Sequence, residues 1–327
     1  FPINYKGWYN RANALLKLGS IHEALHSYEE TLKLRPDYTK AWYNRGIVLA
    51  QLKRFEDAIA SYDKALEVRP HFSAAHYNRG NLLYKLGQYS EALNSYERVL
   101  EIRSDLYEVW YNQANALYKL GQYEQAIAGY DTALGLKEDF AEAWYNRANT
   151  LDVLCRYEDA IANYRRALEI DPNFSEAWQN LGETYQKLGQ YEDAIAHYDQ
   201  AISNKPDFPE AWRSRGIALR KVSRHDDAIA SFDRAIEIDP NSTESWFRRG
   251  QTLEHLGNCK AAIASYDKAL SLNPRSDKTW YNRGLVLSRL GEHEDAIACF
   301  DQAIALNPNL PDVHSRREAS MKALEKN

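Results

Sequence analysis

Apolar residues follow a helical spacing twice in every 34 residues of this chain. In the first half of one such unit, Trp42, Gly46 and Leu49 are three or four positions apart, which is typical of one face of an amphipathic helix. A second stripe with the same spacing occupies the later half of each unit, as in the segment 157–168. The pattern predicts two helices per unit and no strand.

Tryptophan fixes the period. All eight tryptophans share one register of 34 residues, and the only gap in that register is filled by His76. They are Trp8, Trp42, Trp110, Trp144, Trp178, Trp212, Trp246 and Trp280. A fixed period of about 20 to 50 residues is typical of proteins built from stacked repeats. Positions are counted below from the Trp site of each repeat, so that Asn44 stands at position +2.

Small residues and helix-breaking residues recur at fixed positions. A glycine at position +11 in six of nine repeats favours the left-handed end of a helix, and a proline in seven of nine prevents the second helix from continuing. Position +4 is always Gly or Ala, and position +16 is always Ala. Because a small side chain is kept on both helices, we expect their backbones to approach each other there.

The residues at these positions resemble the tetratricopeptide repeat (TPR), with Trp, Gly or Ala, Leu, Ala, Tyr or Phe, Ala and Pro in a unit of 34 residues. The resemblance implies an all-α, right-handed superhelical solenoid whose first helices line an inner groove. Nine repeats are predicted, at 5–38, 39–72, 73–106, 107–140, 141–174, 175–208, 209–242, 243–276 and 277–310. Residues 1–310 would form the repeat region. Residues 311–327 are predicted to form a half-polar capping helix over its open end.

Composition limits the classes of function. The formal net charge of −5 gives no general attraction to nucleic acid or to an anionic membrane. No apolar run could span a membrane, and the three cysteines show no metal-ligand spacing. We therefore expect a cytoplasmic protein with a protein partner and without a cofactor or metal. Because the chain starts at Phe1 and its only methionine is Met321, we also expect further domains in a longer protein.

Asparagine and tyrosine gather on the helix face opposite the tryptophans, at positions +1, +2 and +5. Asparagine costs about 0.7 kcal/mol relative to alanine inside a helix, so solvation alone does not explain the row. Its amide can pair with the C=O and N–H groups of a peptide backbone, and tyrosine adds rigid contact area. The row resembles the one that lines the TPR groove of O-linked N-acetylglucosamine transferase and of kinesin light chains.

The predicted peptide-binding residues are Asn10, Asn44, Asn78, Asn112, Asn146, Asn180, Asn282, Asn13, Asn81, Asn115, Asn149, Tyr43, Tyr77, Tyr111 and Tyr145. The alternative is that the asparagines bond neighbouring repeats to one another. In the seventh and eighth repeats the groove becomes basic, which suits a carboxylate or a phosphate. Its candidates for binding an acidic group are Arg213, Arg220, Lys221 and Arg248. The alternative for these four is a solvated surface.

One sequence matches a zinc-protease motif: His22-Glu23-Ala24-Leu25-His26 has the H-E-x-x-H spacing. We interpret it as a coincidence, since Ala24 and Leu25 are packing residues and no third ligand is identifiable. The sequence thus predicts a non-enzymatic scaffold that binds an extended peptide in its groove. The alternatives are the recognition or sensor arm of a larger multidomain protein, and a zinc metalloenzyme.

Overall fold

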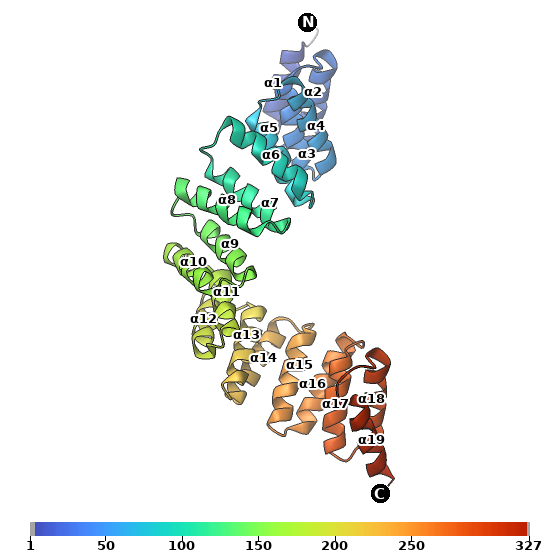
Figure 1. Ribbon diagram of the computed structural model, residues 1–327. Coiled ribbons are helices and arrows are strands. Elements are labelled where there is room, and N and C mark those ends of the chain that lie inside the picture. The colour runs from blue at the N-terminus through green and yellow to red at the C-terminus, as the bar shows by residue number, and fades with distance from the viewer. Residues whose placement is uncertain (1–3, 326–327) are drawn as a thin grey trace. The chain divides into compact units, whose positions relative to one another are not determined.

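The computed structural model describes residues 4–325, and this part of the chain consists of helices and short turns without a strand (Figure 1). The helices of the first five repeats are α1 (Tyr5–Lys17), α2 (Ile21–Leu34), α3 (Thr39–Gln51), α4 (Phe55–Val68), α5 (Ser73–Lys85), α6 (Tyr89–Ile102), α7 (Tyr107–Lys119), α8 (Tyr123–Leu136), α9 (Ala141–Val153) and α10 (Tyr157–Ile170). They are followed by α11 (Ser175–Lys187), α12 (Tyr191–Asn204), α13 (Pro209–Lys221), α14 (His225–Ile238), α15 (Thr243–His255), α16 (Cys259–Leu272), α17 (Asp277–Arg289), α18 (His293–Leu306) and α19 (Val313–Leu324).

The chain divides into two compact units between Ile170 and Asp171. The N-terminal unit contains α1–α10 and the C-terminal unit contains α11–α19. Within each unit, the two helices of a repeat pack against each other, and successive helices are neighbours. The predicted all-α fold of nine helix pairs and a final helix is confirmed for the described residues. Each predicted 34-residue range encloses one pair, and we propose these ranges as the repeat units.

The turn inside each repeat has a left-handed residue at position +11. Six repeats have glycine there, with φ between +75° and +83°. Lys53, Cys155 and Ser223 occupy the same position in the other three repeats, with φ of 60°, 59° and 62°. The turn therefore keeps its conformation without glycine, although a side chain in the left-handed region costs roughly 1–2 kcal/mol.

The packing inside a repeat differs in one respect from the prediction. Alanine at position +16 is fully buried in all nine repeats, as expected. The small residue at position +4, however, faces the aromatic ring at position +20. A Cβ added to Gly46 would lie 2.5 Å from the Tyr62 ring, and one added to Gly216 would lie 2.7 Å from the Phe232 ring. The glycine therefore makes room for a buried ring. The predicted approach to the +16 alanine is also seen at Gly182, where an added Cβ would lie 3.1 Å from the Ala194 carbonyl oxygen.

The ring at the Trp site donates a hydrogen bond to the turn before its own helix. The indole N–H of Trp42 donates to the carbonyl of Pro36 at 2.7 Å, and most of the other tryptophans make the same bond six residues back. The Nε2 of His76 contacts the carbonyl of Pro70 at 2.8 Å. Histidine can replace tryptophan at this position because it keeps the ring N–H.

An arginine at position +3 connects successive repeats in both units. Arg79 Nε donates to Asp63 of the preceding repeat at 2.6 Å and, through Nη1, to Ser95 of its own repeat at 2.7 Å. Arg215 makes the same pair of bonds with Asp199 and Ser231 in the C-terminal unit. These arginines already have partners and are part of the stacking.

Candidate functional site

The asparagine row of the N-terminal unit bonds neighbouring repeats to one another. Asn146 Nδ2 donates to the Tyr111 hydroxyl at 2.8 Å and to Asn115 Oδ1 at 3.1 Å, both in the preceding repeat. The +2 asparagines of the second, third and fourth repeats donate in the same way: Asn44 to Tyr9 and Asn13, Asn78 to Tyr43, and Asn112 to Tyr77 and Asn81. The alternative raised from the sequence, bonding between repeats, thus accounts for the amide N–H groups.

The amide oxygens of the same four asparagines have a different environment. Among the described residues, none donates a hydrogen bond to the Oδ1 of Asn44, Asn78, Asn112 or Asn146, and these oxygens are not buried. The hydrogen bonds made by Nδ2 fix the plane of each amide. The row therefore presents oriented, solvent-accessible acceptors, while its donors hold the repeats together.

The row opens into a pocket of about 430 Å³ where the fourth and fifth repeats meet. Its lining residues are Tyr84, Tyr111, Asn115, Tyr118, Lys119, Tyr130, Tyr145, Asn146 and Asn149. A smaller pocket of about 250 Å³ lies one repeat earlier and shares Tyr84 and Asn115 with it. The structure thus brings together five of the predicted peptide-binding residues and adds Tyr84 and Tyr118, at position +8, which sequence reasoning missed.

The phenols of the N-terminal pocket stay uncharged at neutral pH. Burial raises the pKa of Tyr84, Tyr111, Tyr118 and Tyr130 above the usual value. Tyr130 donates to Asn115 Oδ1 at 2.6 Å, so its hydroxyl is occupied. Apart from Lys119, the pocket has a neutral lining of aromatic rings and amides. Such a surface suits a peptide backbone and apolar side chains rather than a charged group.

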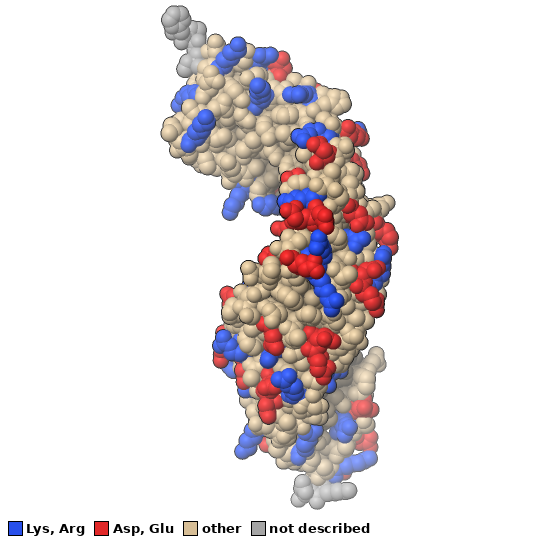
Figure 2. Space-filling model, turned by 90° about the vertical axis from the view of Figure 1, so that its left-hand side faces the viewer, with Lys and Arg blue, Asp and Glu red and all other residues tan. Residues whose placement is uncertain are grey.

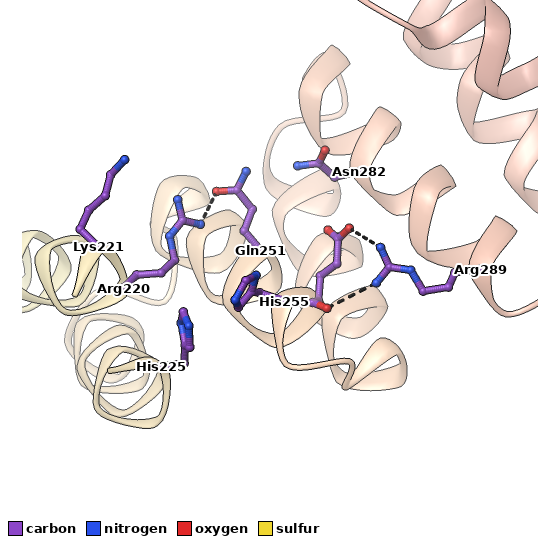
Figure 3. Close-up of a pocket in the computed structure, with 8 residues that line it drawn as sticks. Arg220, Lys221, His225, Gln251, His255, Asn282 and Arg289 are labelled. Carbon is purple, nitrogen blue, oxygen red and sulfur yellow. Dashed lines mark hydrogen bonds and ion pairs between the residues drawn. The ribbon is translucent and has the colours of Figure 1, made fainter. Parts of the chain in front are cut away.

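The groove of the C-terminal unit contains a larger pocket of about 520 Å³ (Figure 3). It is lined by Arg220, Lys221, His225, Gln251, Glu254, His255, Asn282 and Arg289, which come from α13, α14, α15 and α17. In Figure 3 the side chains of Arg220, Gln251 and the two histidines lie close together, and Arg289 lies on the other side. Arg289 forms an ion pair with Glu254. Lys221 extends away from this group.

Arg220 is the central cation of this pocket. Its Nη1 donates to Gln251 Oε1 at 3.0 Å, and no carboxylate among the described residues pairs with it. Burial, with a smaller contribution from Arg248, lowers the pKa of the Arg220 guanidinium below its usual value. A half-buried guanidinium without a counter-ion is unfavourable unless an anion compensates it.

The remaining charges of the pocket are partly neutralised. Arg289 Nη2 lies 3.4 Å from Glu254 Oε1, and Tyr266 donates to Glu254 Oε2 at 2.8 Å. The rings of His225 and His255 have centroids 4.5 Å apart. Sequence reasoning selected neither histidine nor Arg289. His255 and Arg289 stand at position +9, at the same helix end as Lys221, whereas His225 stands at position +13 and begins α14.

Of the other predicted peptide-binding residues, Asn282 lines the C-terminal pocket, Asn81 and Asn112 line the smaller pocket of the N-terminal unit, and the rest line none of these three pockets. Asn10 is exposed at the first repeat, and Asn180 is half-buried in α11. Arg213 does not line the C-terminal pocket. Arg248 pairs with Glu244 at 2.6 Å and belongs with Asn282 to a neighbouring pocket of about 460 Å³. Of the four basic candidates, the structure therefore brings only Arg220 and Lys221 into the C-terminal pocket.

The H-E-x-x-H segment has the surroundings of an ordinary helix surface. His22 and His26 are exposed, while Ala24 and Leu25 are buried in the core. Glu23 lies 3.8 Å from Arg11, and among residues 4–325 no group of three His, Cys, Asp or Glu side chains could hold a metal ion. Over the same range, no helix is long and apolar enough to cross a bilayer.

Models of the tetratricopeptide repeat match residues 9–71, 49–94, 141–174, 163–196, 180–243, 231–264 and 277–310, and a TPR repeat model matches 80–121, 114–151 and 255–291. These matches extend from residue 9 to residue 310 without a gap. The chain belongs to the tetratricopeptide repeat family. Among curated proteins, none matches this TPR chain.

Solved structures of TPR proteins share the fold. The C-terminal part of a TPR protein from Cytophaga hutchinsonii is 16% identical with a TM-score of 0.63, covering 73% of this chain and 98% of its own. YrrB, described as a TPR protein with an unusual peptide-binding site, is 24% identical with a TM-score of 0.51, covering 59% and 97%. The Cut9–Hcn1 complex of APC/C is 15% identical with a TM-score of 0.55, covering 97% and 76%. At these identities the likeness shows the fold.

Proposed function

We propose that this TPR chain is a non-enzymatic protein-interaction scaffold whose N-terminal unit binds an extended segment of a partner protein. The observation that carries the proposal is the neutral pocket at Asn115 and Asn146, where the oriented amide oxygen of Asn146 stands beside tyrosine rings. An extended peptide has backbone N–H groups without internal partners, and the Asn oxygens are acceptors for them. The surrounding tyrosines contribute contact area at little cost in side-chain entropy.

Two further observations support a protein partner. One structural neighbour, YrrB, is described as having a peptide-binding site, although its similarity to this chain is one of fold. On the face in Figure 2, Lys and Arg side chains are separated by uncharged residues and, over most of its length, lie among Asp and Glu side chains. A protein that binds the phosphate backbone of a nucleic acid instead has a continuous stripe of Lys and Arg side chains. We therefore propose a protein segment rather than a nucleic acid as the ligand.

The test uses a displayed library of short linear peptides, selected on the whole chain. We expect the selected peptides to lose affinity for the Asn146→Ala variant. Tyr111→Phe is the comparison variant, since it removes one of the two inter-repeat hydrogen bonds of Asn146 but leaves the Asn146 oxygen and the aromatic ring at position 111 in place. Each backbone hydrogen bond is worth about 0.5–1.5 kcal/mol net, which corresponds to roughly two- to tenfold in affinity.

The two variants separate binding from stacking. If Asn146 contributes an acceptor to the peptide, Asn146→Ala weakens binding more than Tyr111→Phe at equal loss of stability. Equal binding by both variants, at a temperature where both are folded, would mean that the asparagine only holds repeats together. A library that yields no peptide for the parent chain would contradict the proposed function itself.

A further inference from the structure

We propose that the pocket of the C-terminal unit binds a phosphate monoester, carried as a phosphorylated side chain by the partner segment. The inference rests on the proposed function, because it assigns a modified side chain of the partner protein to the C-terminal unit. It selects Arg220, His255 and Arg289 as the groups that surround the phosphate. Arg213 and Arg248, which the sequence also suggested for an acidic group, are outside this set.

Charge is the first argument for an anion with two negative charges. The pocket is lined by three permanent cations, Arg220, Lys221 and Arg289, and by one carboxylate, Glu254. The lining therefore keeps an excess of two positive charges while both histidines are neutral. A phosphate monoester carries about −1.5 to −2 at neutral pH, whereas a carboxylate carries only −1. The phosphate matches the excess charge of the pocket.

The state of Arg220 is the second argument. The arginines at position +3 of the same unit each have a carboxylate: Arg215 lies 2.6 Å from Asp199, and Arg249 lies 2.6 Å from Asp233. Arg220 has only the Gln251 amide oxygen at 3.0 Å. Gln251 accepts from one guanidinium nitrogen of Arg220, and the other two nitrogens have no acceptor among the described residues. A planar guanidinium with free N–H groups is suited to bidentate contact with phosphate oxygens.

The arrangement of the other donors is the third argument. Figure 3 shows His225 and His255 beside Arg220, while Arg289 comes from the opposite side on α17. A neutral imidazole still offers one N–H, and the Asn282 amide offers two. Donors thus approach from α13, α15 and α17. A phosphate monoester presents three terminal oxygens in different directions, whereas a carboxylate presents two in one plane.

The experiment measures binding of four peptide pools to the whole chain by fluorescence polarisation. Each pool has degenerate flanks and a fixed central residue, which is phosphoserine, phosphotyrosine, glutamate or serine. Inorganic phosphate is added as a competitor in a separate arm. We expect at least one phosphorylated pool to bind more tightly than the glutamate and serine pools, by about tenfold or more.

The variants are Arg220→Gln and a matched control, Arg213→Gln. Both replace an arginine of α13 that forms no ion pair with any described residue, but only Arg220 lines the pocket. We expect Arg220→Gln to lose about tenfold or more of the affinity for the phosphorylated pool. Arg213→Gln should change it by less than about twofold, because this half-buried arginine does not line the pocket.

Several results would overturn the inference. The first is equal affinity for the glutamate and phosphorylated pools. The second is an equal loss of affinity in the two arginine variants. The third is competition by inorganic phosphate that is as strong as competition by the phosphopeptide. The last would assign the pocket to the free ion. The result at Asn146 is independent of all three. If unmodified peptides still need Asn146 while Arg220→Gln has no effect, the proposed scaffold function stands and only the phosphate pocket fails.

Discussion

The two pockets are built from the same positions of the repeat but differ in charge. At position +8 the N-terminal pocket has Tyr84 where the C-terminal pocket has Arg220. At position +5 Asn115 corresponds to Gln251, and at +2 Asn146 corresponds to Asn282. The helices around the pockets pack in the same way, with a buried aromatic ring at +20 and a buried alanine at +16. A TPR unit thus separates its stacking residues from its groove residues, so groove chemistry can change from repeat to repeat without a change in fold.

The prediction with the largest expected effect asks whether both units pack the position +16 alanine in the same way. Ala160 in α10 and Ala262 in α16 are each fully buried at position +16. Replacing either with leucine forces extra methylenes into a filled interface, which costs about 1–3 kcal/mol. We expect the two variants to lose similar free energies of unfolding in thermal melts of the whole chain. An Ala262→Leu melt that overlays the parent would mean that the C-terminal unit is packed differently.

The next prediction concerns the asparagine row, which differs between the units. Asn146 donates to the Tyr111 hydroxyl, but the residue that precedes Asn282 at the Tyr111 position is Phe247. Asn146→Ala should therefore destabilise by about 0.5–1.5 kcal/mol for the lost hydrogen bond, offset in part by the better helix propensity of alanine. Asn282→Ala should cost less. Chemical denaturation of both variants measures the difference, and equal losses would contradict a role for the phenol.

A smaller effect is expected at the turns. Lys53 in the N-terminal unit and Ser223 in the C-terminal unit have positive φ where other repeats have glycine. Replacing either with glycine relieves the left-handed strain but adds freedom to the unfolded chain, so we expect a gain of up to about 1 kcal/mol. The control is Gly121→Ala, which should lose a similar amount. A loss in Lys53→Gly would show that its side chain contributes more than its backbone costs.

The smallest expected effect concerns His76, which occupies the Trp site of the third repeat. Burial lowers the pKa of His76 below its usual value. The unfolded chain therefore binds a proton first as the pH falls below about 6.5, and the stability contributed by neutral His76 is lost from there down through the lowered pKa. His76→Trp should remove this part of the pH dependence. Melting temperatures of both proteins across this range measure it, and identical profiles would contradict the assignment.

The positions of many candidate-site residues could be predicted from the sequence, but which of their atoms bond neighbouring repeats and which face a ligand could not. The asparagines and tyrosines could be placed on the groove face from helical spacing alone. The low helix propensity of asparagine shows that the row lowers helix stability. That loss is explained equally well by ligand binding and by bonding between repeats. The bond from Asn146 to Tyr111 joins residues 35 positions apart, in different repeats. Only the stacking distance between repeats decides whether that bond forms.

The sequence by itself determined the repeat, its two helices and the residues on each face, because these follow from a fixed period and local helical geometry. It could not determine what the +4 glycine faces, since the Tyr62 ring reaches Gly46 from the other helix of the pair. Nor could it separate Arg248, which is paired with Glu244, from Arg220, which has no carboxylate partner among the described residues. Both arginines were predicted to bind an acidic group, and only the structure shows that Arg220 lies in the larger pocket. Contacts between repeats depend on how the helices stack, and tertiary structure alone sets that.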